Sequence, residues 1–140
     1  MTKKVSSIDL TDSFEKIPVK IHPDLKQGSL AVAREIAALL RDKQKKKLPC
    51  VLGLATGSTP KTLYAELVRM HKEEKLSFKN VVTFNLDEYY PIDNDALQSY
   101  NRFMRANLFD HVDINPKNIH IPKGETKKED IKLHCNQYEK

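Results

Sequence analysis

The stretch from Leu52 to Pro60 constrains the fold of this 140-residue chain more than any other. The apolar run Cys50 to Leu54 predicts a buried strand, which gives way to a loop of small residues and then to a helix. Thr59 is a suitable N-cap for that helix, and Pro60 suits its first position. A strand, a tight loop and a helix N-terminus in this order are common in α/β proteins.

The same loop has the composition of an anion-binding site. Unpaired N–H groups and the positive end of the helix dipole would point at one spot, and the hydroxyls of Thr56, Ser58 and Thr59 would add donors. The GxxxxGK[ST] spacing of a P-loop is absent, which argues against a nucleoside triphosphate. Since similar turns occur in many α/β proteins with nothing bound, a purely structural loop stays open as the alternative.

The rest of the hydrophobic pattern alternates helices with strands. Helices are predicted from a start between Asp24 and Ser29 to about Lys43, then over residues 60–72 and 99–110, and from residue 129 onwards. Strands are predicted at 50–54, 81–84 and 118–122, with a weaker one at 17–21 that Pro18 would confine to a sheet edge.

This alternation predicts an α/β fold with a mostly parallel, Rossmann-like sheet in a three-layer α/β/α arrangement. We expect the strand at 50–54 to be central and covered by helices on both faces, since it is apolar throughout. Residues 1–16 are predicted to be a polar N-terminal extension, and residues 17–140 to be the N-terminal part of the α/β domain.

Composition and charge exclude several classes of protein. No apolar run approaches the roughly 18 residues of a membrane span, and the polar N-terminus has no signal-peptide core, so we expect a cytoplasmic protein without a membrane partner. The net charge is +5, but the lysines from Lys43 to Lys47 suit a solvated helix end, and nothing matches a nucleic-acid motif. Two cysteines predict no disulfide framework, and the histidines lack metal-ligand spacing, so no metal site is expected.

Two carboxylates, Asp87 and Glu88, follow the strand at 81–84 directly. Ligands of parallel sheets bind outside the carboxyl ends of strands, so these residues and the anion loop would face one crevice if their strands are neighbours. A crevice wall would partly desolvate a carboxylate there and suit it to accept and return a proton near neutral pH. A structural role, in which Asp87 caps a turn or pairs with Arg102 or Arg105, stays open.

Three segments resemble the glucosamine-6-phosphate deaminases: Val51-Leu-Gly-Leu-Ala-Thr-Gly-Ser-Thr-Pro60, Ser77-Phe-Lys-Asn-Val-Val-Thr-Phe-Asn-Leu-Asp-Glu-Tyr89 and Asn107-Leu-Phe-Asp-His-Val-Asp-Ile114. The resemblance is collinear from about Ser29 to the end of the chain. The related 6-phosphogluconolactonases share the phosphate loop, but their strand end differs from Asn-Leu-Asp-Glu-Tyr, so they are the second candidate.

The resemblance implies conversion of glucosamine 6-phosphate and water to fructose 6-phosphate and ammonia, without a cofactor. It places the sugar phosphate on Gly57, Ser58 and Thr59, with Thr56 in a supporting role. Asp87 would be the base that moves a proton between C2 and C1, which leaves Glu88 a supporting role. The implied partner is a small sugar phosphate, and homo-oligomerisation is an open alternative.

One part of the family pattern has no counterpart among these residues. In the family a later loop supplies a histidine and two acidic residues for ring opening, and a lysine that grips the phosphate. We therefore expect these 140 residues to be the first part of a longer protein, inactive alone, with a sheet edge and apolar faces left uncovered. A non-catalytic sugar-phosphate sensor remains an alternative function.

Overall fold

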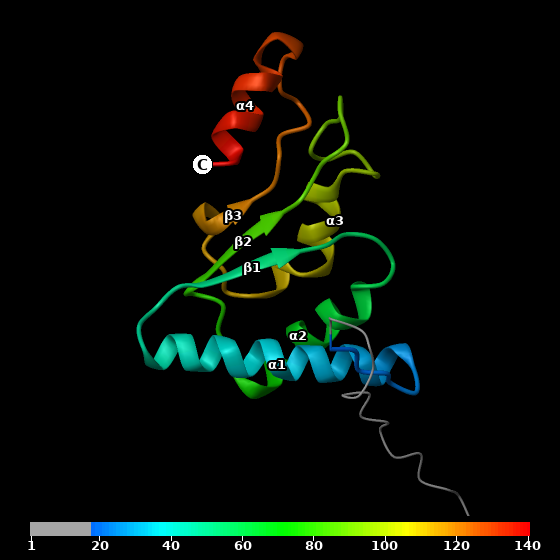
Figure 1. The fold of residues 1–140 in the computed structure, drawn as a ribbon, viewed down its shortest axis with the longest axis vertical. Coiled ribbons are helices and arrows are strands. Elements are labelled where there is room, and N and C mark those ends of the chain that lie inside the picture. Colours follow the sequence, from blue (N-terminus) through cyan, green and yellow to red (C-terminus); the bar gives the residue numbers. More distant parts are fainter. Residues whose placement is uncertain (1–17) are drawn as a thin grey trace, which may run out of the picture.

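Three parallel strands organise residues 18–140, which are the residues that this computed structural model describes (Figure 1). They are β1 (Cys50–Leu54), β2 (Val81–Asn85) and β3 (Ile119–His120), in the sheet order β1-β2-β3. Leu54 pairs with Asn85, and Phe84 pairs with His120. The predicted parallel α/β sheet is therefore confirmed, while the extension predicted at residues 1–16 lies outside the described residues.

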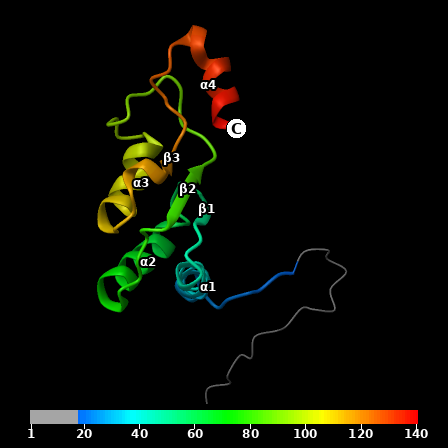
Figure 2. The same ribbon diagram turned by 90° about the vertical axis from the view of Figure 1, so that its left-hand side faces the viewer.

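Four helices accompany the sheet, and their bounds follow the sequence pattern closely. They are α1 (Leu25–Lys45), α2 (Lys61–Glu74), α3 (Tyr100–Asn107) and α4 (Ile131–Tyr138), with short 3₁₀ turns at Phe109–His111, Pro116–Asn118 and Lys128–Asp130. In Figure 2, α2 and α3 lie on the same side of the strands, and α4 lies beyond them at the opposite end from α1. None of the helices in residues 18–140 has the length and apolar character needed to cross a membrane.

The core fills only one face of the sheet. Cys50, Leu52 and Leu54 alternate inward along β1, whereas Val51 between them is 60% exposed. Phe84 of β2 is likewise 38% exposed. The expectation that strand 50–54 is central and covered on both faces is thus wrong for the described residues, in which β1 is an edge strand with one face exposed.

Helix α1 begins where its cap dictates. The side chain of Asp24 accepts a hydrogen bond from the Gln27 N–H, which satisfies one of the unpaired donors of the first turn. The buried residues Ala33, Ala37 and Leu40 lie on the predicted apolar stripe, so both the start and the face of this helix are confirmed.

The strand predicted at residues 17–21 does not form in the described part of that segment. Residues 18–22 belong to neither a helix nor a strand. Pro18 has no N–H to donate to a ladder, and Lys20 instead forms an ion pair with Glu35 of α1 at 3.2 Å. The segment therefore follows the helix surface rather than the sheet edge.

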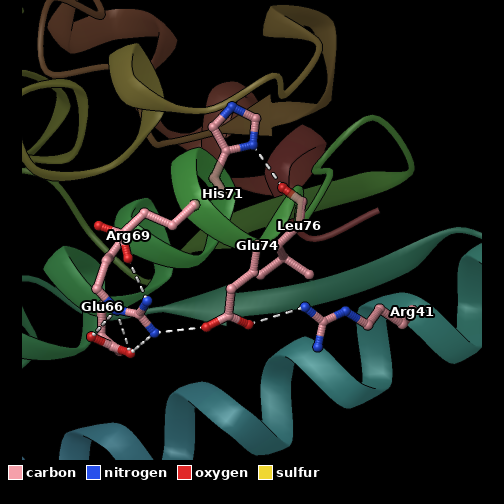
Figure 3. A network of polar contacts seen from close by, with 7 residues as sticks. Arg41, Glu66, Arg69, His71, Glu74 and Leu76 are labelled. Atoms are coloured by element: carbon pink, nitrogen blue, oxygen red, sulfur yellow. Dashed lines mark hydrogen bonds and ion pairs between the residues drawn. The ribbon is translucent and has the colours of Figure 1, made fainter.

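A network of charged side chains joins α1 to α2 at the surface (Figure 3). Arg69 contacts Glu66, Glu73 and Glu74 on its own helix, and Glu74 also pairs with Arg41 of α1 at 3.3 Å. Exposed ion pairs add little individually, so this network supplements the buried helix contacts beneath it.

Asp113 anchors the turn that leads into β2. Its carboxylate accepts a hydrogen bond from the Ser77 hydroxyl at 2.8 Å and another from the Phe78 N–H, and it lies 3.7 Å from His71 Nδ1. Burial opposes ionisation of this carboxyl, but the two hydrogen bonds outweigh it and keep the pKa of Asp113 below its usual range. The charged form is therefore the one that stabilises the fold.

We expect Asp113→Asn to lower the free energy of unfolding by about 1 kcal/mol at pH 7, because charged acceptors bond more strongly than neutral ones. The folded-state pKa is depressed, so this stabilisation is present above the unfolded pKa of about 4 and is lost as the pH falls through the folded value. Denaturant unfolding of wild type and variant should converge as the pH falls below about 4. Asp110→Asn, in an exposed ion pair, should stay within about 0.5 kcal/mol of wild type. A difference that persists unchanged at acidic pH would contradict the role of the charge.

Candidate functional site

The two segments singled out from the sequence begin side by side. The loop at residues 55–60 leaves the carboxyl end of β1 and the segment at residues 86–90 leaves that of β2, directly after the paired residues Leu54 and Asn85. Since β1 and β2 are neighbouring parallel strands, both segments start at one edge of the sheet. The structure therefore brings the predicted anion loop and the predicted carboxylates together.

Gly57 gives the anion loop its shape. Its φ of +101° is a conformation that residues with a side chain rarely adopt, and an added Cβ would meet nothing within 4 Å. Gly57, Ser58 and Thr59 are exposed, and Thr56 is half-buried. The backbone on the outer side of this loop is thus open to a ligand.

The helix after this loop starts one residue later than the sequence predicts. Pro60, not Thr59, occupies the N-cap position of α2, and no side chain caps this helix. The predicted capping role of Thr59 is therefore wrong, because residues 58–61 form a turn in which the Lys61 N–H donates to the Ser58 carbonyl. The first turn of α2 also holds no acidic residue, so the positive end of its dipole is left without a neutralising carboxylate, as an anion site requires.

Two buried polar side chains, which sequence reasoning did not single out, hold the strand ends in place. The Asn85 amide, on a residue only 2% exposed, donates to the Leu54 carbonyl at 3.0 Å and so ties β2 to β1 at their last pair. The Tyr64 hydroxyl donates to the Ala55 carbonyl at the start of the loop. Burial raises the pKa of Tyr64 to about 12, so its hydroxyl stays protonated as a donor.

Asp87 has an open environment. Its side chain is exposed, and the preceding Leu86 is 91% exposed. The expected crevice wall that would desolvate Asp87 is therefore not formed by residues 18–140. The structural alternative also finds no support there, because Arg102 donates to the Asp95 carbonyl and Arg105 bonds to Asn101 and Asp110.

Glu88, rather than Asp87, has the structural capping role that the sequence pattern allowed for Asp87. Its carboxylate accepts hydrogen bonds from the Ser99 hydroxyl at 3.0 Å and from the N–H groups of Tyr100 and Asn101, both at 2.9 Å. It therefore caps the N-terminus of α3, where a negative charge also complements the helix dipole. Of the two adjacent carboxylates, only Asp87 remains directed to solvent.

This division of roles predicts different effects for two matched substitutions. Glu88→Gln should lower the free energy of unfolding by about 1–2 kcal/mol, because a neutral amide cannot accept the same set of hydrogen bonds. Asp87→Asn should change it by less than about 0.5 kcal/mol, as is usual for exposed positions. Chemical denaturation of the three proteins checks this, and equal destabilisation by both substitutions would contradict it.

Comparisons with known proteins agree with this arrangement. The sequence profile of the glucosamine-6-phosphate isomerases and 6-phosphogluconolactonases matches residues 23–140. Glucosamine-6-phosphate deaminase of Treponema denticola is 53% identical over 102 residues, which are 73% of this chain and 37% of that protein. A putative glucosamine-6-phosphate deaminase-like protein of Bacteroides thetaiotaomicron is 46% identical over 126 residues, which are 90% of this chain and 19% of that protein.

Solved structures share the fold. A monomeric glucosamine-6-phosphate deaminase of the NagB superfamily superposes with a TM-score of 0.76 at 38% identity, over 83% of this chain and 46% of that one. A 6-phosphogluconolactonase from Thermotoga maritima superposes with a TM-score of 0.64 at 26% identity, over 80% of this chain and 48% of that one. The chain thus spans less than half the length of these relatives. By its sequence and its fold, it belongs to the family of glucosamine-6-phosphate isomerases and 6-phosphogluconolactonases.

Proposed function

We propose that this chain forms the phosphate-binding and proton-transfer half of a glucosamine-6-phosphate deaminase. The observation that carries the proposal is the pairing of β1 with β2. Because of this pairing, the anion loop before the uncapped helix α2 and the segment with the exposed carboxylate of Asp87 leave the same edge of the sheet. A sugar phosphate has the matching chemistry, an anion at one end and a carbon acid at the other. Relatives named as deaminases support this substrate class.

The proposed reaction converts glucosamine 6-phosphate and water to fructose 6-phosphate and ammonia. Gly57, Ser58 and Thr59 would hold the phosphate through loop N–H groups and hydroxyls, with Thr56 in support. Asp87 would take the proton from C2 of the open-chain amino sugar and return it at C1, while a proton of the amine passes to the C1 oxygen, so that the aldehyde becomes an alcohol and C2 becomes an imine carbon. Water then adds to this imine, the C2=N bond is replaced by the C2=O bond of the ketose, and ammonia leaves. These are proton transfers and a hydrolytic exchange, for which no cofactor is required.

The partners and location of the protein are part of the same proposal. A small sugar phosphate is the proposed ligand, in the cytoplasm, with neither nucleic acid nor a membrane as partner. Homo-oligomerisation stays open as an alternative, and size-exclusion chromatography with light scattering decides it.

Two other functions make different predictions for the same assays. A non-catalytic sensor would bind glucosamine 6-phosphate when joined to a complete partner half, yet release no ammonia. A lactonase would hydrolyse 6-phosphogluconolactone instead, and the shared fold of the Thermotoga maritima enzyme keeps this candidate in view. Measuring ammonia release and lactone hydrolysis side by side separates the three.

The anion loop is tested by Gly57→Val in the 140-residue chain. A left-handed backbone costs a residue with a side chain roughly 1–2 kcal/mol, so the loop should abandon its present shape and bind glucosamine 6-phosphate about tenfold more weakly. Gly53→Val is the matched control, because Gly53 lies on β1 with nothing within 4 Å of an added Cβ and no positive φ. Calorimetric titration measures both, and unchanged affinity in Gly57→Val would refute the role of the loop.

The proposed base is tested by turnover in a chimera. The matching segment of the Treponema denticola deaminase is replaced by this chain, and ammonia release is measured with and without Asp87→Asn. Loss of a general base typically slows a reaction by about 10²–10⁴-fold, while phosphate binding should be almost unchanged. Asp95→Asn, in the exposed loop before α3, is the control and should keep the rate. An active chimera that survives Asp87→Asn would show that another group is the base.

A further inference from the structure

A lysine lies at the point where the anion loop becomes a helix. Lys61 is the first residue of α2, and its N–H donates to the Ser58 carbonyl at 3.4 Å, within the turn that ends the loop. Side chains of an α-helix tilt toward the N-terminus of that helix, so the stem of Lys61 leaves the backbone in the direction of the loop. The proposed function has so far given this cation no role.

The position of Lys61 is electrostatically unfavourable for a cation. The positive end of the dipole of α2 lies at this N-terminus and repels a positive side chain. The first turn of α2 holds no acidic residue, and none of the ion pairs within residues 18–140 includes Lys61. A phosphate on the loop would offset this repulsion, because the dipole and the ammonium group would both attract it.

The Lys61 ammonium group lies over an aromatic ring. Its Nζ is 5.6 Å from the centroid of the Phe103 ring on α3, which lies with α2 on one side of the strands (Figure 2). Lys61 is exposed, and a cation–π contact is weak at an exposed position. A hydrogen bond from an ammonium group to a phosphate oxygen is stronger, because both partners are charged. The flexible four-carbon stem of lysine allows one partner to be exchanged for the other.

We propose that Lys61 binds the phosphate group of the ligand, and that its ammonium group leaves the Phe103 ring for a phosphate oxygen when the anion loop is occupied. This inference rests on the proposed function, since it requires a phosphate at Gly57, Ser58 and Thr59. Lys61 adds a full positive charge to the neutral donors of that loop. Inorganic phosphate and glucosamine 6-phosphate should therefore depend on Lys61 to the same degree.

The test compares wild type, Lys61→Gln, Lys61→Arg and Lys72→Gln in the 140-residue chain. Lys72 is the matched control, because it is an exposed lysine in the last turn of the same helix. It lies roughly 16 Å from Lys61 along the helix axis, well beyond the screening length of about 8 Å at physiological ionic strength. NMR titrations that follow the Gly57 N–H signal give the dissociation constants for inorganic phosphate and for glucosamine 6-phosphate.

For Lys61→Gln we expect both ligands to bind about tenfold more weakly, as for the loss of one hydrogen bond between charged groups. Lys61→Arg should stay within about threefold of wild type and Lys72→Gln within about twofold, and all three variants should keep the denaturation midpoint of wild type. Unchanged affinity in Lys61→Gln, equal weakening by Lys72→Gln, or a lowered midpoint that accounts for the loss would overturn the inference. Weakening of glucosamine 6-phosphate alone would also overturn it, because Lys61 would then act on the sugar.

A wild-type chain that binds neither ligand would overturn the proposed function together with this inference. If wild type and Lys61→Gln bind both ligands equally well, the inference alone fails and the anion loop keeps its proposed role.

A second measurement follows the lysine itself and needs no substitution. The Phe103 ring shields protons that lie over it, so the ε-methylene signals of Lys61 should lie upfield of those of Lys72. Added inorganic phosphate should move them to the position of an exposed lysine, with the dissociation constant given by the Gly57 N–H signal. Signals that stay upfield at saturating phosphate would show that the ammonium group remains over Phe103, and would overturn the proposed exchange of partners.

Discussion

The site depends on one strand pairing. β1 and β2 run parallel in a register that ends with Leu54 beside Asn85, and the Asn85 amide closes that end by donating to the Leu54 carbonyl. The carboxyl ends of parallel strands lie at the same edge of the sheet, so the segments that follow β1 and β2 must both begin at that edge. A slip of one residue would turn Asn85 to the uncovered face and break this tie, because successive strand residues point to opposite faces. The register of β1 against β2 therefore also determines the geometry of the site.

Two adjacent carboxylates take opposite tasks for a comparable reason. Residues that follow one another in extended chain point in different directions, so Asp87 and Glu88 meet different surroundings. Glu88 turns toward the unpaired N–H groups of α3, and Asp87 stays directed to solvent. The capping carboxylate of Glu88 therefore fixes the backbone from which the Asp87 side chain projects. The segment that carries Asp87 and Glu88 buries little apolar surface. Charge-assisted hydrogen bonds to Glu88 hold it in place instead.

Hydrophobic periodicity predicted most of the fold because the spacing of apolar residues shows which face of a helix or strand is buried. The apolar spacing of α1 and the compact runs of β1 and β2 led to bounds within a few residues of those observed, and the anion loop and Asp87 fell at the expected strand ends. Coverage of β1 was the exception. An apolar residue such as Val51 reads as buried, yet whether a layer lies over it depends on residues far away in sequence.

The polar contacts of the site were harder to foresee, for physical reasons that differ between residues. Thr59 has the right chemistry for a cap, but residues 58–61 form a turn, and the helix starts only after Pro60. Glu88 caps a helix eleven residues away, which no local capping rule covers. Tyr64 carried a usable signal, because it lies three residues before Leu67 on the buried stripe of α2 and a buried tyrosine hydroxyl needs a partner.

The exposed edge of the sheet is held together mainly by polar links that reach across it. The Tyr138 hydroxyl of α4 donates to the Asn85 carbonyl at 2.7 Å and also lies 3.1 Å from the His120 carbonyl, so a third element is attached to the ends of β2 and β3. Gly124, in the loop after β3, packs so closely on the segment after β2 that an added Cβ would lie 2.8 Å from the Tyr89 and Ile92 carbonyl oxygens. The segments that follow all three strands are thus tied to their neighbours through backbone groups, which do not change position when a surface side chain changes rotamer. An edge tied in this way can hold a loop and a carboxylate at a set distance while both face solvent, and that is what binding a small charged ligand from solution requires.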